Sequence, residues 1–216
     1  MYRILLSFVL PLSVLLTGCG DGLEPIEETD ALGFRNEFRI DPETGLKQGG
    51  LRQYDPQGRL LSEEFYVNGQ LHGPRTIYHS NGQEDVTENY DMGEFAGDYR
   101  HYDSLGTLRL EGQYIDGAMN KAWTNYYANG RIRSAVTFVD NAENGPFREW
   151  YDNGSPRMSG NYLDGDNIEG ILHRYDSVTG ELNRILECDF GRCHTVWTPD
   201  STQAPSPGVD MTPPAR

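Results

Sequence analysis

Basic residues are scarce in this chain of 216 residues. It has 18 lysines and arginines against 33 aspartates and glutamates, which gives a formal charge of −15 at pH 7. No basic stripe is present that would release counterions from a phosphate backbone, so nucleic acid is not an expected partner. Hydrophobic residues are few as well, at 37%. This composition disfavours a thick apolar core and favours a thin sheet faced with aromatic side chains.

Patterns that would indicate a helical protein or an enzyme are missing. No stretch places apolar residues at i, i+3, i+4 and i+7 between helix caps, so almost no helix is expected. No nucleophile, base and orienting group can be assigned from spacing among the scattered histidines, which are His72, His79, His101, His173 and His194. We therefore expect a protein that is not an enzyme and uses no cofactor.

No hydrophobic run is long enough to cross a membrane. The longest, residues 4–16, follows Arg3 and has the charge order and length of a secretory signal. It ends in Leu16-Thr17-Gly18-Cys19, which resembles the bacterial lipobox, where cleavage before the cysteine accompanies lipid modification. The resemblance implies a lipoprotein anchored through acyl chains on Cys19, with an ordinary secretory signal as the alternative. Gly20 in place of aspartate favours the outer membrane, facing the periplasm or the cell surface, and Asp21 leaves the choice of membrane open.

Both ends of the chain lack apolar periodicity. After the signal peptide (1–18), residues 19–33 are acidic and are expected to form a disordered tether. Residues 198–216 contain five prolines among Ser, Thr and Gly and are expected to form a disordered tail. The folded domain is therefore expected over residues 34–197.

Cysteine is rare, with three residues in all. If Cys19 is lipidated, Cys188 and Cys193 remain as a pair that brackets a glycine, and such a pair can bridge a hairpin in an oxidising periplasm. We expect a disulfide there. A metal site with His194 is the alternative, although it is one ligand short of closed zinc coordination. A calcium site is a further alternative without the spacing of a known loop, built from Asp164, Asp166, Asn167 and Glu169.

One spacing of 24 residues dominates the rest of the sequence. A position-five series, counted from the glycine that opens each unit, reaches its last member one residue late and consists of Tyr54, Tyr78, Tyr102, Tyr126, Trp150 and Tyr175. A second-strand series keeps the period without a slip and consists of Tyr66, Tyr90, Tyr114, Phe138 and Tyr162. Self-similarity at this period is typical of a stacked repeat array, and packing between repeats is the plain interpretation of both series.

Each unit has the pattern of a β-hairpin. Asn-Gly pairs such as Asn81-Gly82 stand where a tight turn needs positive φ, and Asp-Gly pairs such as Asp116-Gly117 stand at the opposite end. The second strand alternates with period two, as in Leu108, Leu110, Gly112 and Tyr114. The sequence therefore predicts an all-β fold, an elongated single-layer array of about six 24-residue hairpins.

The first strand of each unit is less regular. Position two is often aromatic as well, three residues before position five, so either both sheet faces are partly covered or the strand is bulged. The position-two series varies more in identity, running Leu51, Arg75, Tyr99, Trp123, Phe147 and Leu172. Because a variable aromatic position can face a partner, Tyr99, Trp123 and Phe147 are the candidate partner-binding residues.

The units resemble the MORN (membrane occupation and recognition nexus) repeat in its bacterial variant. Tyr78-His79-Ser80-Asn81-Gly82 and Tyr162-Leu163-Asp164-Gly165 carry the tyrosine and Asn/Asp-Gly pattern, and six units cover about three quarters of the chain. Proteins of this variant are often described as antitoxins, of the YwqK type. Lys121 and Asn141 stand where the pattern has glycine, which leaves the geometry of those turns open.

These features favour a lipid-anchored, non-enzymatic interaction or scaffold module of the bacterial envelope. Its expected partners are the membrane, through Cys19, and a protein or peptide bound by strand addition at a sheet edge or by docking in a groove. An antitoxin or immunity-like neutraliser of a toxin is the alternative, and an unrecognised enzyme is the third. The oligomeric state is open.

Overall fold

The computed structural model describes residues 22–203, 205 and 208–213. The signal peptide and Cys19 lie outside the described residues, so the lipoprotein assignment stays a prediction. No helix occurs in the described part of the chain, and so none there could span a membrane.

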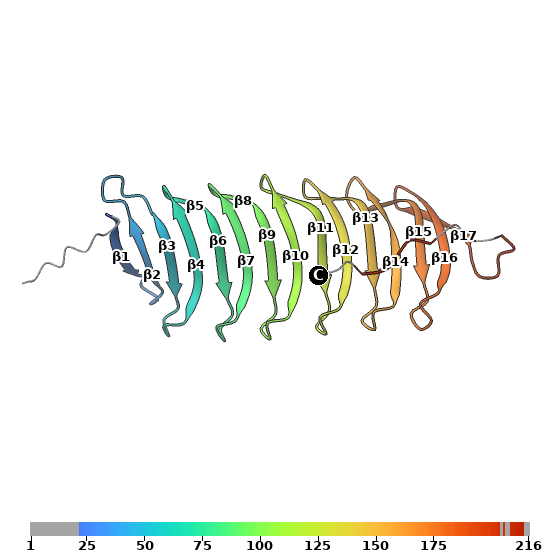
Figure 1. Cartoon of the computed structure of the whole chain (residues 1–216), viewed down its shortest axis with the longest axis horizontal. Helices are drawn as coiled ribbons and strands as arrows, with labels where there is room; N and C mark the ends of the chain where they lie inside the picture. Colours follow the sequence, from blue (N-terminus) through green and yellow to red (C-terminus); the bar gives the residue numbers. More distant parts are fainter. Residues whose placement is uncertain (1–21, 204, 206–207, 214–216) are drawn as a thin grey trace, which may run out of the picture.

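Seventeen strands form one open antiparallel sheet that meanders along the chain, so the described residues confirm an all-β array of hairpins (Figure 1). The strands are β1 (Glu24–Thr29), β2 (Arg35–Ile40), β3 (Gly49–Tyr54), β4 (Leu60–Val67), β5 (Gln70–Leu71), β6 (Gly73–Tyr78), β7 (Glu84–Asp91), β8 (Glu94–Phe95), β9 (Gly97–Tyr102), β10 (Leu108–Ile115), β11 (Ala118–Tyr126), β12 (Ile132–Val139), β13 (Ala142–Trp150), β14 (Pro156–Leu163), β15 (Asn167–Tyr175), β16 (Leu182–Asp189) and β17 (Arg192–Trp197). β5 with β6, and β8 with β9, are the two pieces of one interrupted strand in their units, since each piece pairs with the same neighbour.

The array begins earlier than the sequence predicts. β1 lies inside the segment 19–33, for which we expect a disordered tether, and pairs with β2 from Glu24↔Ile40 to Thr29↔Arg35. Pro25 and Ile26 are the only apolar residues of β1, and Ile26 lies opposite Phe38. Because main-chain hydrogen bonds rather than hydrophobic alternation order this strand, composition alone does not reveal it.

A β-bulge stands beside position five in every unit. In the hairpin of β11 and β12, Tyr126 pairs with Ile132 and Asn125 pairs with Ser134, so Arg133 is the extra residue. The same shift recurs in the other five hairpins. In this bulge the extra residue is in the second strand, and the first strand keeps its alternation from position two to position five. Positions two and five therefore lie on opposite faces, which we call the position-two face and the position-five face.

Rings on the position-two face interleave between units. Phe95 lies between Tyr90 and Tyr114, with ring centroids 4.7 Å from each. Tyr99 contacts its equivalent, Trp123, in the next unit at 5.5 Å. Packing between repeats is thus present, but in the second-strand series an inserted residue separates equivalent rings. Lys47 takes this inserted place in the first unit, with Nζ 5.1 Å from the ring centroid of Tyr66.

The turns that connect one unit to the next have positive φ at both central residues, as type I′ turns require. Asp116 and Gly117 have φ of 50° and 76°. Asn141, which replaces the turn glycine, has φ of 68°, and Lys121, which replaces an opening glycine, has φ of 62°. Both substitutions therefore keep the repeat geometry.

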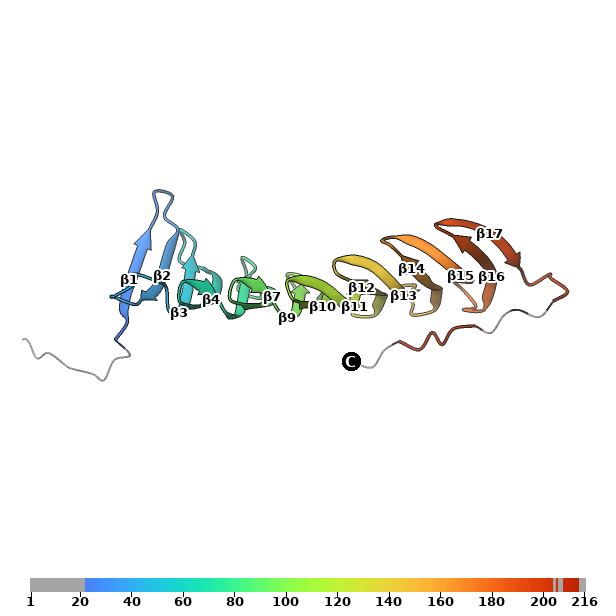
Figure 2. The same cartoon turned by 90° about the horizontal axis from the view of Figure 1, so that it is seen from above.

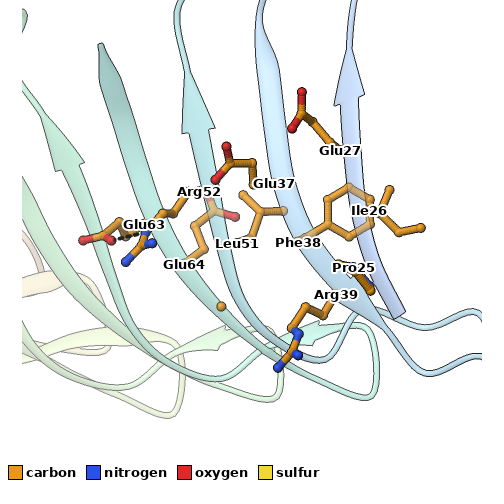
Figure 3. A pocket seen from close by; sticks show the side chains of 11 residues that line it. Pro25, Ile26, Glu27, Glu37, Phe38, Arg39, Leu51, Arg52, Glu63 and Glu64 are labelled. Atoms are coloured by element: carbon orange, nitrogen blue, oxygen red, sulfur yellow. Dashed lines mark hydrogen bonds and ion pairs between the residues drawn. The ribbon is translucent and has the colours of Figure 1, made fainter. Parts of the chain in front are cut away.

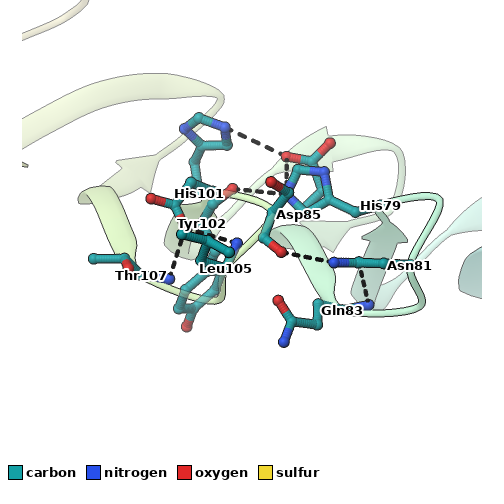
Figure 4. Close-up of polar contacts among 10 residues, drawn as sticks. His79, Asn81, Gln83, Asp85, His101, Tyr102, Leu105 and Thr107 are labelled. Carbon is teal, nitrogen blue, oxygen red and sulfur yellow. Dashed lines mark hydrogen bonds and ion pairs between the residues drawn. The ribbon is translucent and has the colours of Figure 1, made fainter. Parts of the chain in front are cut away.

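The Asn-Gly turns differ from the prediction. Gly82 has a φ of 84°, whereas Asn81 is not among the residues with positive φ. The Asn81 side chain instead donates to the carbonyl of Ser104 in the next unit, at 2.7 Å (Figure 4). Asn129 and Asn153 donate in the same way to Asp152 and Ser177. The asparagine therefore joins neighbouring repeats, and the glycine alone supplies the left-handed residue.

Replacing Gly112 by alanine tests the packing of the Trp123 ring over Gly112 on the neighbouring strand. A Cβ at Gly112 would lie 2.1 Å from Cδ2 of Trp123, so the indole must move. We expect G112A to lower the free energy of unfolding by about 1–3 kcal/mol, the usual range for overpacking, as measured by chemical denaturation. Gly50→Ala is the matched control, because its nearest neighbour would be 4.0 Å away and its φ is not positive. Equal unfolding midpoints for the two variants would contradict this packing.

Candidate functional site

The position-five face carries a buried cluster in the C-terminal half of the array. Tyr126, Ile132 and Trp150 are its buried members, and Leu108, Ala135 and Met211 pack against them. All but Met211 come from neighbouring strands of the sheet. Met211 belongs to the proline-rich tail, so a distant segment completes the cluster.

The tail returns along the sheet after β17. Its described residues run back toward β11 on one side of the array (Figures 1 and 2). At the reversal, Nε1 of Trp197 donates to the carbonyl of Gln203 at 3.0 Å. Further on, Nε1 of Trp150 donates to the carbonyl of Met211 at 2.9 Å. For residues 208–213, this docking corrects the expectation of a disordered tail over residues 198–216.

The tail docks without forming a strand. Prolines remove backbone donors and favour an extended conformation that cannot continue a sheet ladder. An aromatic N–H that donates to a carbonyl of such a segment, beside a pocket for one apolar side chain, is a common mode of recognising proline-rich peptides. Trp150 and Met211 provide these two elements here. The position-five face therefore holds this extended segment of the chain against Trp150.

A polar row lies on the same face, directly beside the aromatic cluster. Arg148, Ser159 and His173 are cross-strand neighbours on β13, β14 and β15. Ser159 is 1% exposed and His173 is 4% exposed. Nε of Arg148, Oγ of Ser159, both ring nitrogens of His173 and Oη of Tyr175 are buried without a hydrogen-bond partner. Each such group costs about 1–3 kcal/mol when left unpaired, so the row is destabilising as it stands.

Two titrating groups report on this environment. Burial lowers the pKa of His173, because the charged ring loses hydration. In the tail, the pKa of Asp210 is lowered first by hydrogen bonds from Thr212 and further by the positive charge of Arg148. The carboxylate of Asp210 therefore lies within the field of the row, while its Oδ1 accepts the amide of Thr212 at 2.8 Å.

The three candidate partner-binding residues lie on the opposite face. Trp123 and Phe147 are 2% and 1% exposed. Trp123 covers Gly112, Phe147 covers Gly160 and stacks on Tyr162, and Tyr99 contacts Trp123. Rings so buried present no surface, so Trp123 and Phe147 stabilise the array and the prediction that they bind a partner is corrected.

Two other hollows occur along the sheet. A groove of about 580 Å³ lies over β1 to β4, with Ile26, Phe38 and Leu51 beside four glutamates (Figure 3). A second hollow of about 760 Å³ is lined by His79 and His101 among other residues. Asp85 bridges these two histidines, at 3.5 Å and 3.3 Å.

The disulfide is confirmed. Cys188 and Cys193 are paired directly across the last hairpin and are bonded, with Cα atoms 4.0 Å apart. Cys188 is also a buried member of the cluster that contains Phe147 and Leu172, so it continues the packing where an aromatic residue is missing. The metal alternative for this pair is therefore wrong. In the calcium alternative, Glu169 accepts the amide of Phe190 at 2.9 Å, and the described residues contain no cluster suited to a metal ion.

One repeat unit, which contains Arg148 and Ser159 of the row, matches a known family. Residues 143–164 match the model of the MORN repeat variant. The chain carries a MORN repeat variant. The matched MORN unit includes Arg148, Trp150 and Ser159, and its neighbours repeat the same hairpin.

Comparisons with whole proteins add little. None of the curated proteins matches this chain. Among solved structures, the chain is similar to one in a crystal structure of a GtfA/B complex bound to UDP and GlcNAc, with 17% identity and a TM-score of 0.24. The match covers 54% of this chain and 22% of that chain, so the matched part spans about a fifth of the length of that protein.

Stability should depend on pH through His173. Above the usual histidine pKa of about 6.5, the ring is neutral in both the folded and the unfolded chain. Below it, the unfolded chain binds a proton that the folded chain resists, so stability falls as the pH drops toward the lowered pKa of the folded state. We expect His173→Gln to flatten this fall when the free energy of unfolding is compared at pH 7.5 and pH 5. His194→Gln, at a side chain that is 70% exposed, is the control, and equal slopes for both variants would contradict the burial effect.

Proposed function

We propose that this MORN-repeat protein is a non-enzymatic interaction module of the bacterial envelope, held to a membrane through lipid on Cys19. It binds an extended segment of a protein partner on the position-five face. The docked tail is the observation that supports this proposal most, because it is an extended, proline-rich segment held on this face by Trp150. Binding is by docking on this face rather than by strand addition at a sheet edge.

The shape of the array supports a role away from the bilayer. Cys19 precedes β1, which stands at one end of the array, and the tail groove lies toward the other end (Figure 1). At the usual spacing of about 4.8 Å between strands, the groove at β14 is roughly 50 Å from β1 along the sheet. An anchored chain would therefore present the groove to partners well outside the headgroup region.

Cross-linking from the two faces tests the proposed surface. Ile171 and Arg174 are both exposed on β15, and their odd separation places Ile171 on the position-five face and Arg174 on the other. With a photoreactive residue at Ile171, we expect a covalent adduct with an envelope protein, which added tail peptide suppresses. The same residue at Arg174 is the control and should give no such adduct. Adducts from Arg174 alone, or equally from both positions, would overturn the choice of face. A toxin as the adduct would favour the antitoxin alternative.

The anchor is tested separately. Replacing Cys19 by serine removes the sulfur to which a lipid would be attached, so this variant should not incorporate labelled palmitate in growing cells. A Cys188→Ser, Cys193→Ser double variant keeps Cys19 and should incorporate the label. Equal labelling of the Cys19 variant and the unmodified chain would contradict the lipoprotein assignment.

A further inference from the structure

The docked tail leaves the hydrogen-bonding groups of the polar row without partners. Every group left unpaired in the row can donate a hydrogen bond: the Nε–H of Arg148, the hydroxyls of Ser159 and Tyr175, and one N–H of neutral His173. Four unpaired donors on one face favour the binding of an acceptor, and the positive charge of Arg148 favours a negative one. The tail brings the Asp210 carboxylate near Arg148, yet Oδ1 of Asp210 accepts from Thr212 in the tail itself. The row therefore keeps its unpaired donors while the tail is docked.

We infer that the tail is a displaceable stand-in, and that Arg148, Ser159, His173 and Tyr175 form a subsite for a carboxylate carried by the partner segment. This inference rests on the proposed function and specifies its ligand. The partner is an extended peptide with a long apolar side chain that packs on Tyr126, Ile132 and Trp150, as Met211 does. Three residues before that side chain, it carries an aspartate or glutamate that reaches the row. Such a segment makes the contacts of the tail and adds the hydrogen bonds that the tail lacks, so it displaces the tail.

Gly208 shows where this carboxylate would enter. A Cβ built at Gly208 would lie 3.8 Å from Oη of Tyr175, an ordinary contact distance, with no strain from positive φ. Gly208 stands three residues before Met211, whose carbonyl and side chain are already seated. A glutamate at this position therefore has room for its side chain beside the row.

The full-length chain allows the subsite to be tested within the molecule. In the Gly208→Glu variant, the new carboxylate should accept hydrogen bonds from the row, and the tail should dock about tenfold more tightly, the effect of one charge-assisted hydrogen bond. Hydrogen exchange at the indole N–H of Trp150, which donates to the carbonyl of Met211 in the docked tail, measures this docking equilibrium. Gly208→Gln is the matched control for size and polarity without charge. Equal protection in the glutamate and glutamine variants would overturn the carboxylate subsite.

The residues of the row are tested in the same background. Ser159→Ala alone should leave tail docking and the melting temperature unchanged or slightly raised, because the hydroxyl that it removes has no partner. Combined with Gly208→Glu, Ser159→Ala or Tyr175→Phe should remove much of the gain in protection. A gain that survives both changes would place the carboxylate elsewhere.

Displacement is tested with synthetic peptides and the unmodified chain. A peptide of sequence SPEVDMTPP should displace the tail at about a tenth of the concentration that SPQVDMTPP needs, as followed by the NMR shifts of residues 208–212 in the isotopically labelled chain. Equal potency of the two peptides, or no displacement by either at millimolar concentration, would overturn the inference. If a partner is cross-linked at Ile171 but Gly208→Glu does not tighten the docking of the tail, the proposed function is retained and the carboxylate subsite is rejected.

Discussion

A sheet of one layer has no second layer against which to bury its apolar side chains, and this constraint shapes the rest of the molecule. On the position-two face, rings lie flat over neighbouring strands and interleave between units, which requires glycine beneath them at Gly112 and Gly160. On the position-five face, rings such as Trp150 are spaced by a whole unit and need a cover. The tail supplies it over β11 to β15, where most of the fully buried residues are found.

The N-terminal units satisfy the same constraint with ion pairs in place of some of the packed rings. At position two, Arg75 lies where later units have rings, and it bonds Glu64 and Glu88 at 3.0 Å each. Tyr66 and Tyr90 donate to the same two glutamates, and burial, followed by the hydrogen bond to Glu88, raises the pKa of Tyr90 to about 12. Partly buried ion pairs add less net stability than packed rings, since desolvation offsets much of their attraction. The C-terminal half is therefore the more rigid support for a binding groove.

The parts of the structure that follow from local chemistry could be predicted from the sequence. The 24-residue period, the Asp-Gly turns and the bridge between Cys188 and Cys193 are all set by residues near one another in the chain. The role of Asn81 could not be predicted, because a side-chain bond to the next repeat and a left-handed backbone favour the same residue. Alternation left open whether Phe147 and Trp150 lie on opposite faces or the strand between them is bulged, and it could not tell which face is open to a ligand. That depends on Met211, 61 residues beyond Trp150, whose only local signal is a proline-rich sequence typical of disorder.

A tethered tail changes what a partner must achieve. Since the tail competes at the high effective concentration of a linked ligand, a partner with the same contacts would bind only weakly from solution. Selectivity then comes from groups that the tail leaves unsatisfied, and on this face these are Arg148, Ser159, His173 and Tyr175. A buried unpaired donor is costly to the free protein and favourable only once a matching acceptor arrives. The same row that weakens the closed state therefore provides the free energy that allows the correct segment, and not any extended peptide, to open it.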